Sequence, residues 1–331
     1  RKLKPGDKLT FHTFNPVTLT IDVNELSCDR TEPLALVGEN IDATVVTVKT
    51  KYGTMTSWVD AAGRPRQTEV AMMQAKLSYR DEPKEQALSL DHDGQRVDLA
   101  TATAIRPDKP IPHPREVRRL RLKVKGLNLL SAVPNDGSQQ IKELADDWRE
   151  VTVTAPPPAQ TTTPSEAERA NLLRATPYIQ ADNAELQAAA KQAVGEAKTP
   201  ADKAHAIQLY VRGRVKWQSN VGMFRSALEV FHDPNGVCRD AAALYTALAR
   251  AAGLPTRVCG GLIYLNDSFL GHAWAETWVG DRWQPVDATL SQQVADAARL
   301  KLAQGDDYTA LFEMLPALGN LTVQVLEVKG Q

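Results

Sequence analysis

A cysteine at the start of a predicted helix is the residue of this sequence whose position best suits chemistry. Cys238 follows a turn-forming His-Asp-Pro-Asn-Gly segment, and the Ala-rich run after it keeps Leu244 and Leu248 on one helical face. Gly253 and Pro255 end that run, as is typical of a helix C-terminus. A sulfur in the first turn lies at the positive end of the helix dipole, which favours thiolate over thiol. The pattern predicts a nucleophile, the alternative being a small buried apolar side chain.

A β-hairpin downstream of the cysteine carries a histidine and an aspartate. Residues 271–279 alternate like a strand, Gly280-Asp281 predicts a two-residue turn, and residues 282–287 run back. With that turn, His272 and Asp287 share a face as diagonal neighbours, roughly 7–8 Å apart at the backbone. A three-residue loop would place them on opposite faces. Thiol, imidazole and carboxylate are the groups needed for acyl transfer through a thioester.

The residues around this hairpin resemble the transglutaminase-like superfamily, whose core is a papain-type fold. Gly236-x-Cys238, the passage ALARAAGLPTRV, the strand HAW and the strand W-x-P-V-D-x-T occur in the family's order. The resemblance implies that Cys238 is the nucleophile, His272 the general base and acid, and Asp287 the residue that orients the imidazole. The resemblance covers the segment from Gly236 to Thr289.

The sequence predicts an α+β protein with two domains. We expect a β-rich N-terminal domain at 1–154, a Pro/Thr-rich linker at 155–164, and a transglutaminase-like domain at 165–331 whose Cys-bearing helix packs on an antiparallel sheet. Three consecutive prolines favour an extended linker. Alternating or β-branched segments predict N-terminal strands at 9–14, 17–23, 43–49, 54–60, 65–70 and 117–124. This half also resembles the N-terminal region of some bacterial relatives. That resemblance implies no function for it.

Helix signals dominate the segment between the linker and Cys238. Ser165 and Glu168 form a predicted capping box, and two helices are expected at 183–194 and 199–212. After the hairpin, the sequence predicts helices at 295–303 and 308–315. A closing strand is expected at 321–328, where apolar and polar residues alternate.

Two residues upstream of Cys238 are candidates for holding the oxyanion of the reaction. Transglutaminases use an aromatic N–H upstream of the cysteine, and Trp217 is the tryptophan between the predicted linker and Cys238. His232 lies on the loop before the cysteine, where papain-like enzymes place a glutamine donor. The alternatives are a cleft-wall tryptophan and an ordinary loop histidine. The backbone N–H of Cys238 is a donor in either case.

Composition and charge argue against several other functions. The 331 residues include 39 basic and 40 acidic side chains, a net charge of −1, which suggests no nucleic-acid partner. The basic residues between 115 and 123 lack interleaved aromatics and suit a solvated strand face. No apolar run reaches the length of a membrane span.

Neither a metal nor a cofactor is expected. His12, His92 and His113 stand apart without metal-ligand spacing, and the acidic segment 91–94 is too short for a calcium loop. Three cysteines do not make a disulfide framework, so Cys28 and Cys259 are predicted to be buried thiols. Since the chain begins with Arg1, a removed leader is conceivable, and the resemblance to exported bacterial relatives implies a periplasmic or otherwise exported protein.

The expected function is thiol-dependent acyl transfer on peptide or carboxamide bonds of a protein or peptide substrate. Water as acceptor makes a cysteine peptidase or amidase, whereas a lysine amine makes a cross-linking transglutaminase. We favour the hydrolase because the sequence lacks a calcium site of the kind that gates the animal cross-linking enzymes. A third alternative is a binding scaffold that retains the fold without turnover, against which the intact set of three residues argues.

Overall fold

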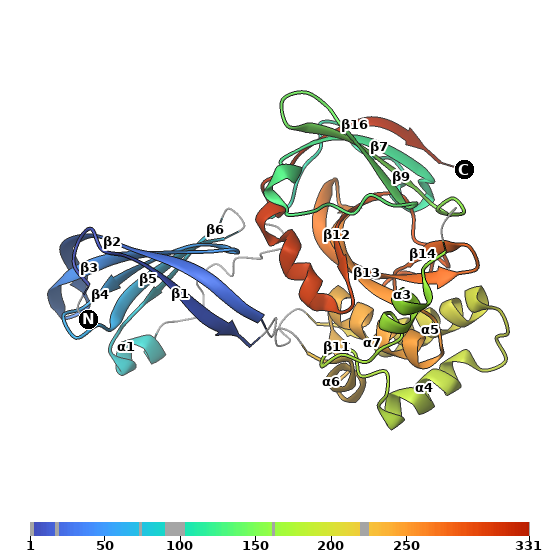
Figure 1. Ribbon diagram of the computed structural model, residues 1–331, viewed down its shortest axis with the longest axis horizontal. Coiled ribbons are helices and arrows are strands. Elements are labelled where there is room, and N and C mark those ends of the chain that lie inside the picture. Colours follow the sequence, from blue (N-terminus) through green and yellow to red (C-terminus); the bar gives the residue numbers. More distant parts are fainter. Residues whose placement is uncertain are drawn as a thin grey trace. The chain divides into compact units, whose positions relative to one another are not determined.

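The computed structural model divides the chain between Thr103 and Ala104 into two units, Arg1–Thr103 and Ala104–Gln331. It describes residues 3–16, 20–72, 75–89, 103–160, 163–218 and 225–330. His92 and the acidic segment 91–94 therefore lie outside the described residues. The first unit is β-rich and the second combines helices with antiparallel sheets, which confirms the predicted α+β class (Figure 1).

The first unit is a six-stranded antiparallel meander. Each strand pairs with its sequence neighbours, in the order β1 to β6, and only a few residues separate successive strands in the sequence. The strands are β1 (Lys8–Asn15), β2 (Thr20–Leu36), β3 (Glu39–Thr50), β4 (Gly53–Val59), β5 (Pro65–Met72) and β6 (Ala75–Arg80), and the short helix α1 (Lys84–Ser89) follows.

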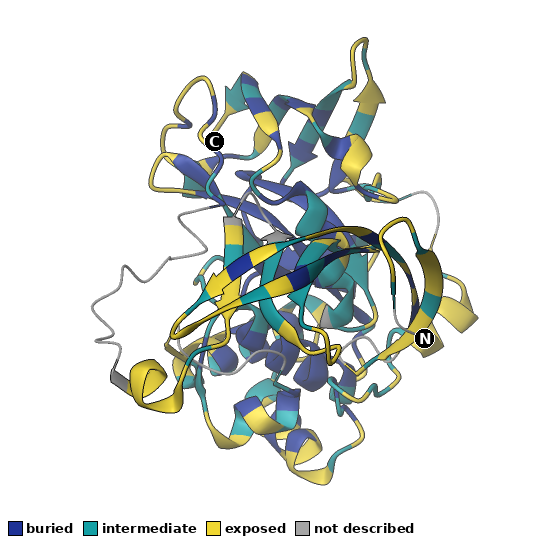
Figure 2. Ribbon diagram, turned by 90° about the vertical axis from the view of Figure 1, so that its left-hand side faces the viewer, coloured by how far each residue is buried: buried dark blue, intermediate teal, exposed yellow. Residues whose placement is uncertain are grey.

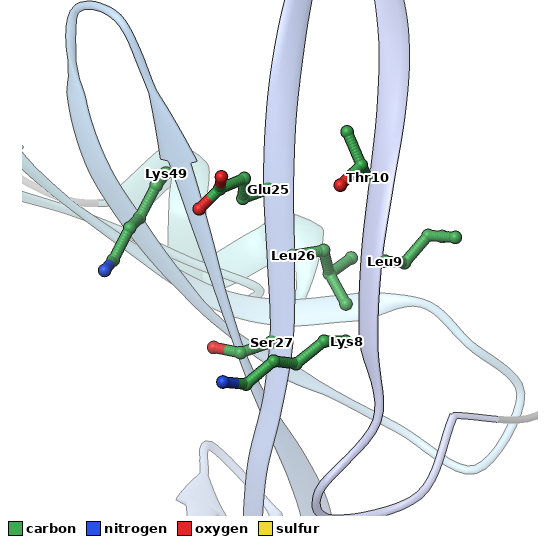
Figure 3. A pocket seen from close by; sticks show the side chains of 7 residues that line it. All are labelled: Lys8, Leu9, Thr10, Glu25, Leu26, Ser27 and Lys49. Carbon is green, nitrogen blue, oxygen red and sulfur yellow. The ribbon is translucent and has the colours of Figure 1, made fainter.

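Buried and exposed residues alternate along β2 and β3, so one face of this sheet forms a small core (Figure 2). Cys28 is buried on that face, as predicted. A cavity of about 360 Å³ lies along the first strands (Figure 3). Its lining consists of Lys8, Leu9, Thr10, Glu25, Leu26, Ser27 and Lys49.

The second unit contains two four-stranded antiparallel sheets. The sheet that carries the hairpin has the order β14-β13-β12-β15, and the other has the order β16-β7-β9-β8. Their strands are β7 (Arg119–Lys125), β8 (Gln139–Glu143), β9 (Trp148–Thr154), β12 (Thr256–Leu265), β13 (Ser268–Val279), β14 (Arg282–Val286), β15 (Arg299–Gly305) and β16 (Thr322–Lys329).

The predicted domain boundary is corrected by this pairing. β7 lies between β9 and the C-terminal strand β16, so residues 104–154 belong with the second unit and not with the N-terminal strands. The expected linker at 155–164 is also packed where it is described: the Gln160 N–H donates to the Asp281 carbonyl at 2.8 Å. Prolines there thus mark an extended packed segment. The pairing joins strands far apart in sequence, which local composition does not reveal.

Helices cover one side of the β12–β13 sheet (Figure 1). The predicted capping box of Ser165 and Glu168 is present, and Asn183 and Thr199 cap the next two helices. The helices are α3 (Glu166–Asn171), α4 (Ala184–Val194), α5 (Pro200–Arg214), α6 (Ala227–His232) and α7 (Cys238–Ala251), with the short strands β10 (Lys216–Trp217) and β11 (Asn235–Gly236) between them. Residues 240–250 of α7 are all buried, and α7 packs on β12 and β13.

The prediction of a helix at 295–303 is wrong, because Arg299–Gly305 forms strand β15 and pairs with β12. Leu300 and Leu302 alternate with Arg299 and Lys301, a strand pattern hidden by the fact that all four side chains are buried. The predicted helix at 308–315 is a 3-10 helix, η3 (Tyr308–Ala317), and shorter 3-10 turns occur at η1 (Pro114–Glu116) and η2 (Leu127–Leu129). The closing strand β16 is confirmed.

None of the described helices combines the length and the apolar composition that a membrane crossing requires.

Candidate active site

Cys238 is the first residue of α7, and the residues just before and after it fix that helix start. Val237 is extended, and its N–H donates to Oδ2 of Asp240 at 2.8 Å, so a carboxylate lies in the first turn. Arg225 Nε lies 3.5 Å from the other Asp240 oxygen. Position 236 favours glycine because a Cβ there would lie 2.8 Å from the Asp240 Cβ. The Gly-x-Cys spacing thus allows Asp240 to anchor the turn that presents the sulfur.

The hairpin of β13 and β14 has the predicted register. Val279 pairs with Arg282 across a two-residue turn, and Gly280 adopts the positive φ of 65° that this turn demands. His272 and Asp287 consequently share a face, and His272 Nε2 lies 2.8 Å from Asp287 Oδ2. Both side chains are nearly inaccessible to solvent.

The same strand brings the imidazole to the cysteine. The Cys238 sulfur is hydrogen-bonded to the His272 side chain and accepts a hydrogen bond from the backbone N–H of Ala273. Because Nε2 of His272 faces Asp287, Nδ1 is the ring nitrogen left for the sulfur. The structure therefore places Cys238, His272 and Asp287 in the order that the sequence predicts.

Charge in this site favours an ion pair between thiolate and imidazolium. Burial alone would raise the pKa of Cys238, but the charge and hydrogen bond of His272 and the Ala273 N–H outweigh it, and the pKa lies below that of an ordinary thiol. Burial would likewise lower the pKa of His272, yet Asp287 and Cys238 raise it to about 10. Burial opposes ionisation of Asp287 as well, and His272, Arg299 and Thr289 nevertheless hold its pKa well below the usual range.

Asp287 is held by residues that the sequence did not single out. Oδ1 accepts from the N–H of Thr289 at 3.0 Å and from its hydroxyl at 2.6 Å, and Oδ2 also accepts from Arg299 Nη1 at 3.2 Å. Thr289 belongs to the quoted W-x-P-V-D-x-T strand, which was a usable signal. Arg299 lay in the segment expected to be helical, so its side chain was not placed near Asp287.

Gln208 of α5 is a second residue that the sequence did not single out. Its side-chain N–H₂ group lies within 2.7–3.0 Å of the carbonyl oxygens of Asp287, Leu290 and Gln292, and its side chain is fully buried. One amide therefore holds the loop after β14 against the helix layer. A glutamine on a helix carries no sequence signal for such a role.

The two oxyanion candidates lie in different environments. Trp217 pairs with Gly236 in the parallel bridge of β10 and β11, so its backbone lies beside the residue that precedes the nucleophile turn. The residue as a whole is 72% exposed. His232 ends α6, where its Nε2 lies 2.9 Å from Glu185 Oε2 of α4. The structure thus engages His232 in a surface contact with Glu185 and does not bring it into the Cys238–His272–Asp287 group.

Among the described residues, no group of three or more His, Cys, Asp and Glu side chains is arranged to hold a metal ion. Cys259 is buried in β12, as predicted, and burial followed by the charge of Glu276 raises the pKa of its thiol. Cys238 is the partly exposed member of the three free cysteines.

Comparison with known proteins identifies a family for the segment that carries the candidate site. A family model described as the transglutaminase-like superfamily matches residues 187–288, a range that begins in α4 and ends just after Asp287. This part of the chain belongs to the transglutaminase-like superfamily. The transglutaminase-like domain therefore includes all three residues of the candidate site.

One curated relative and several solved structures resemble parts of the chain. An uncharacterized protein of Mycobacterium leprae (strain TN) is 30% identical over 96 residues, which are 27% of this chain and 34% of the relative. The chain therefore spans about a third of that relative's length.

Two solved structures share 20% and 18% identity with the chain. A candidate cysteine protease from Cytophaga hutchinsonii has a TM-score of 0.43 and covers 65% of this chain and 86% of its own. The periplasmic domain of TgpA from Pseudomonas aeruginosa has a TM-score of 0.40 and covers 57% and 73%. The transglutaminase-like domain and its Cys-His-Asp group support a thiol-dependent enzyme.

Proposed function

We propose that this protein is a cysteine peptidase or amidase that cleaves peptide or carboxamide bonds of a protein or peptide through a thioester. The observation that carries the proposal is the contact order sulfur, imidazole, carboxylate at Cys238, His272 and Asp287. This order supplies a nucleophile, a proton carrier and a group that orients the carrier.

Acylation begins with the Cys238 thiolate. Its electron pair forms the bond to the carbonyl carbon, and the carbonyl π electrons move onto oxygen to give an oxyanion. The backbone N–H of Cys238 lies in the first turn of α7, where backbone donors have no preceding intrahelical carbonyl, and it can donate to that oxyanion. Trp217 is our candidate for a second donor because its backbone lies beside Gly236.

His272 then acts as the acid. Its proton passes to the nitrogen of the leaving amine as the carbon–nitrogen bond breaks, leaving the acyl group on the sulfur and a neutral imidazole. In deacylation the imidazole takes a proton from water, the hydroxide oxygen attacks the thioester, and the thiolate leaves. Asp287 keeps the ring oriented through both halves and favours its protonated form.

The tryptophans near the site favour water over an amine as the acceptor. A cross-linking site needs aromatic walls that exclude water from the thioester. Trp274, Trp278 and Trp283 are each at least nine-tenths buried, and Trp278 packs edge-on against Trp283 at a centroid distance of 5.3 Å. Trp278 and Trp283 therefore serve core packing, and Trp274 packs against His272. This supports hydrolysis as the reaction.

The test supplies the purified protein with glutamine-rich proteins and with unstructured peptides, in the presence of a labelled primary amine. We expect release of ammonia or cleaved peptide with negligible amine incorporation, and neither in Cys238→Ala. Robust incorporation that depends on Cys238 would favour the cross-linking alternative. No product of either kind from any acceptor, with an unreactive Cys238, would favour the non-catalytic scaffold.

We also propose, from the family resemblance, that the protein acts after export from the cytoplasm. Fractionation of the host cell with an antibody against the native protein tests this, and recovery in the cytoplasmic fraction alone would contradict it.

A further inference from the structure

Arg299 joins the candidate site to a second buried carboxylate. Its Nη1 donates to Asp287 Oδ2 at 3.2 Å, and its Nη2 donates to Asp296 Oδ2 at 3.3 Å. Its Nε donates to the Asp296 backbone carbonyl at 3.0 Å, and its side chain is only 3% exposed. A planar guanidinium suits such a site because it holds two carboxylates in fixed directions at once.

The charges along this path alternate in sign. Arg115 of η1 lies 2.8 Å from Asp296 Oδ2, so the order of contacts is Arg115, Asp296, Arg299, Asp287 and His272, with Cys238 beyond the imidazole. Each buried anion lies between two cations, which compensates for its removal from water. The Cys238 thiolate ends the path.

Arg299 also supports the histidine through an aromatic ring. Its guanidinium carbon lies 5.4 Å from the centroid of Trp274, and that ring stacks on His272 at a centroid distance of 6.3 Å and an interplanar angle of 20°. Arg299 therefore contacts the carboxylate partner of His272 directly and the face of the imidazole through one ring. Both contacts restrict how the imidazole can turn.

We propose that Arg299 is a positioning residue of the active site, which fixes the Asp287 carboxylate and supplies positive charge that favours the Cys238 thiolate. This inference rests on the proposed thiolate chemistry. The proposal gives strand β15 a part in the reaction. β15 lies beyond residue 288, where the match to the family model ends.

The titration of Cys238 separates this role from a purely structural one. Removing a cation raises the pKa of every nearby acid, whether carboxyl, thiol or imidazolium. A unit charge roughly 10 Å from a titrating group, at an effective dielectric constant of about 20–40, shifts its pKa by roughly 0.5–1 unit. Several charged groups near the site can contribute to the pKa of Cys238, namely His272, Asp287, Asp296, Arg115 and Arg299. Glu276 and Lys301 lie farther away, along a cavity that Arg299 and Trp274 also line.

The experiment measures the rate of alkylation of Cys238 by iodoacetamide against pH, with the adduct located by mass spectrometry. Arg299→Met removes the charge, Arg299→Gln removes the charge but keeps a hydrogen-bond donor, and Arg299→Lys keeps the charge. The matched control is Lys301→Met. Lys301 is an equally buried cation two positions along β15, whose ion pairs are with Asp136 and Glu276 instead of Asp287.

We expect the acid midpoint of alkylation to move to higher pH by roughly 0.5–1 unit in Arg299→Met and Arg299→Gln. It should stay near the wild-type value in Arg299→Lys and Lys301→Met. Circular dichroism at each pH must show that the variant is folded, because an unfolded fraction would alkylate with the midpoint of an ordinary thiol. Arg299→Gln supplies the neutral variant should Arg299→Met not fold.

Superimposable profiles for wild type and the neutral variants would overturn the role of Arg299, as would an equal shift in Lys301→Met. A wild-type midpoint in the range of an ordinary thiol would overturn the proposed function, and this role with it. An acid-shifted wild type with unmoved Arg299 variants would overturn the role of Arg299 alone.

Discussion

His272 Nε2 lies 2.8 Å from Asp287 Oδ2 although the two residues are 15 apart in sequence. The two-residue turn at Gly280-Asp281 produces this contact, because it pairs Val279 with Arg282 and keeps both side chains on one face. A turn with one residue more would reverse the parity of the returning strand and direct Asp287 to the opposite face. The length of one hairpin loop therefore decides whether the imidazole has a carboxylate partner.

This relationship predicts an acidic thiol at Cys238. We expect the midpoint of alkylation by iodoacetamide to lie below about 8.5, the value of an ordinary thiol. In His272→Ala the midpoint should rise above the ordinary value, because burial still raises the pKa while the stabilising imidazolium is gone. Cys259 is the internal control: it is fully buried and should remain unmodified in the folded protein. A midpoint unchanged by His272→Ala would contradict the ion pair.

Asp287→Asn should narrow the pH range of activity from the alkaline side. Asp287 raises the pKa of His272 to about 10, so the imidazolium that protonates the leaving amine persists to alkaline pH. With a neutral amide in its place, the His272 pKa should fall toward about 6.5 and the basic limb of kcat/KM should move down with it. We expect kcat to fall by up to about 10⁴-fold, the loss seen when the aspartate of a serine-protease triad is replaced by asparagine.

Thr289→Val is the control for that substitution. It removes the hydroxyl bond to Asp287 Oδ1 but leaves the carboxylate, the backbone N–H bond and Arg299 in place. Its effect on kcat should be about 10-fold or less, the equivalent of one ordinary hydrogen bond of about 0.5–1.5 kcal/mol, because the carboxylate keeps its charge and its other donors. If Thr289→Val lowered kcat as much as Asp287→Asn does, the orientation of the Asp287 carboxylate would matter more to catalysis than its charge.

Gln208→Leu should destabilise the domain by about 2–4 kcal/mol, because three carbonyl oxygens lose their buried donor. Gln208→Glu should be worse at neutral pH, since a buried carboxylate would face those same oxygens. Burial raises the pKa of such a carboxyl, so the deficit of the Glu variant should shrink as the pH falls and the group becomes a neutral donor. Urea unfolding at several pH values checks both expectations, and equal stability of Leu and Glu variants at neutral pH would contradict them.

The unit boundary predicts how the chain can be shortened. Residues 104–331 should fold alone and keep an alkylation-reactive Cys238, because β16 then retains its partner β7. Residues 165–331 should not fold cooperatively, since losing β7 and β9 removes the fully buried Leu120, Leu122 and Val151. Thermal unfolding of the two fragments tests this, and a stable, reactive 165–331 fragment would restore the originally expected boundary.

The arrangement of Cys238, His272 and Asp287 was predictable because each part depends on nearby sequence. The helix start follows from a turn segment and an apolar face, and the hairpin register follows from strand alternation around a two-residue turn. Both are local rules that act over a few residues. The quoted Gly-x-Cys, HAW and W-x-P-V-D-x-T segments added the expected family, and the match to residues 187–288 confirmed it.

The sequence by itself thus determined the three reacting groups and the hairpin that orients two of them. Tertiary structure decided the rest. Strand β15 and the place of residues 104–154 depend on pairing between distant segments, and the sites of Arg299 and Gln208 depend on which buried groups those segments meet. From the sequence, a charged residue is expected to be exposed to solvent. Arg299 is buried because folding brings a carboxylate from another strand to it, and the sequence does not reveal that partner.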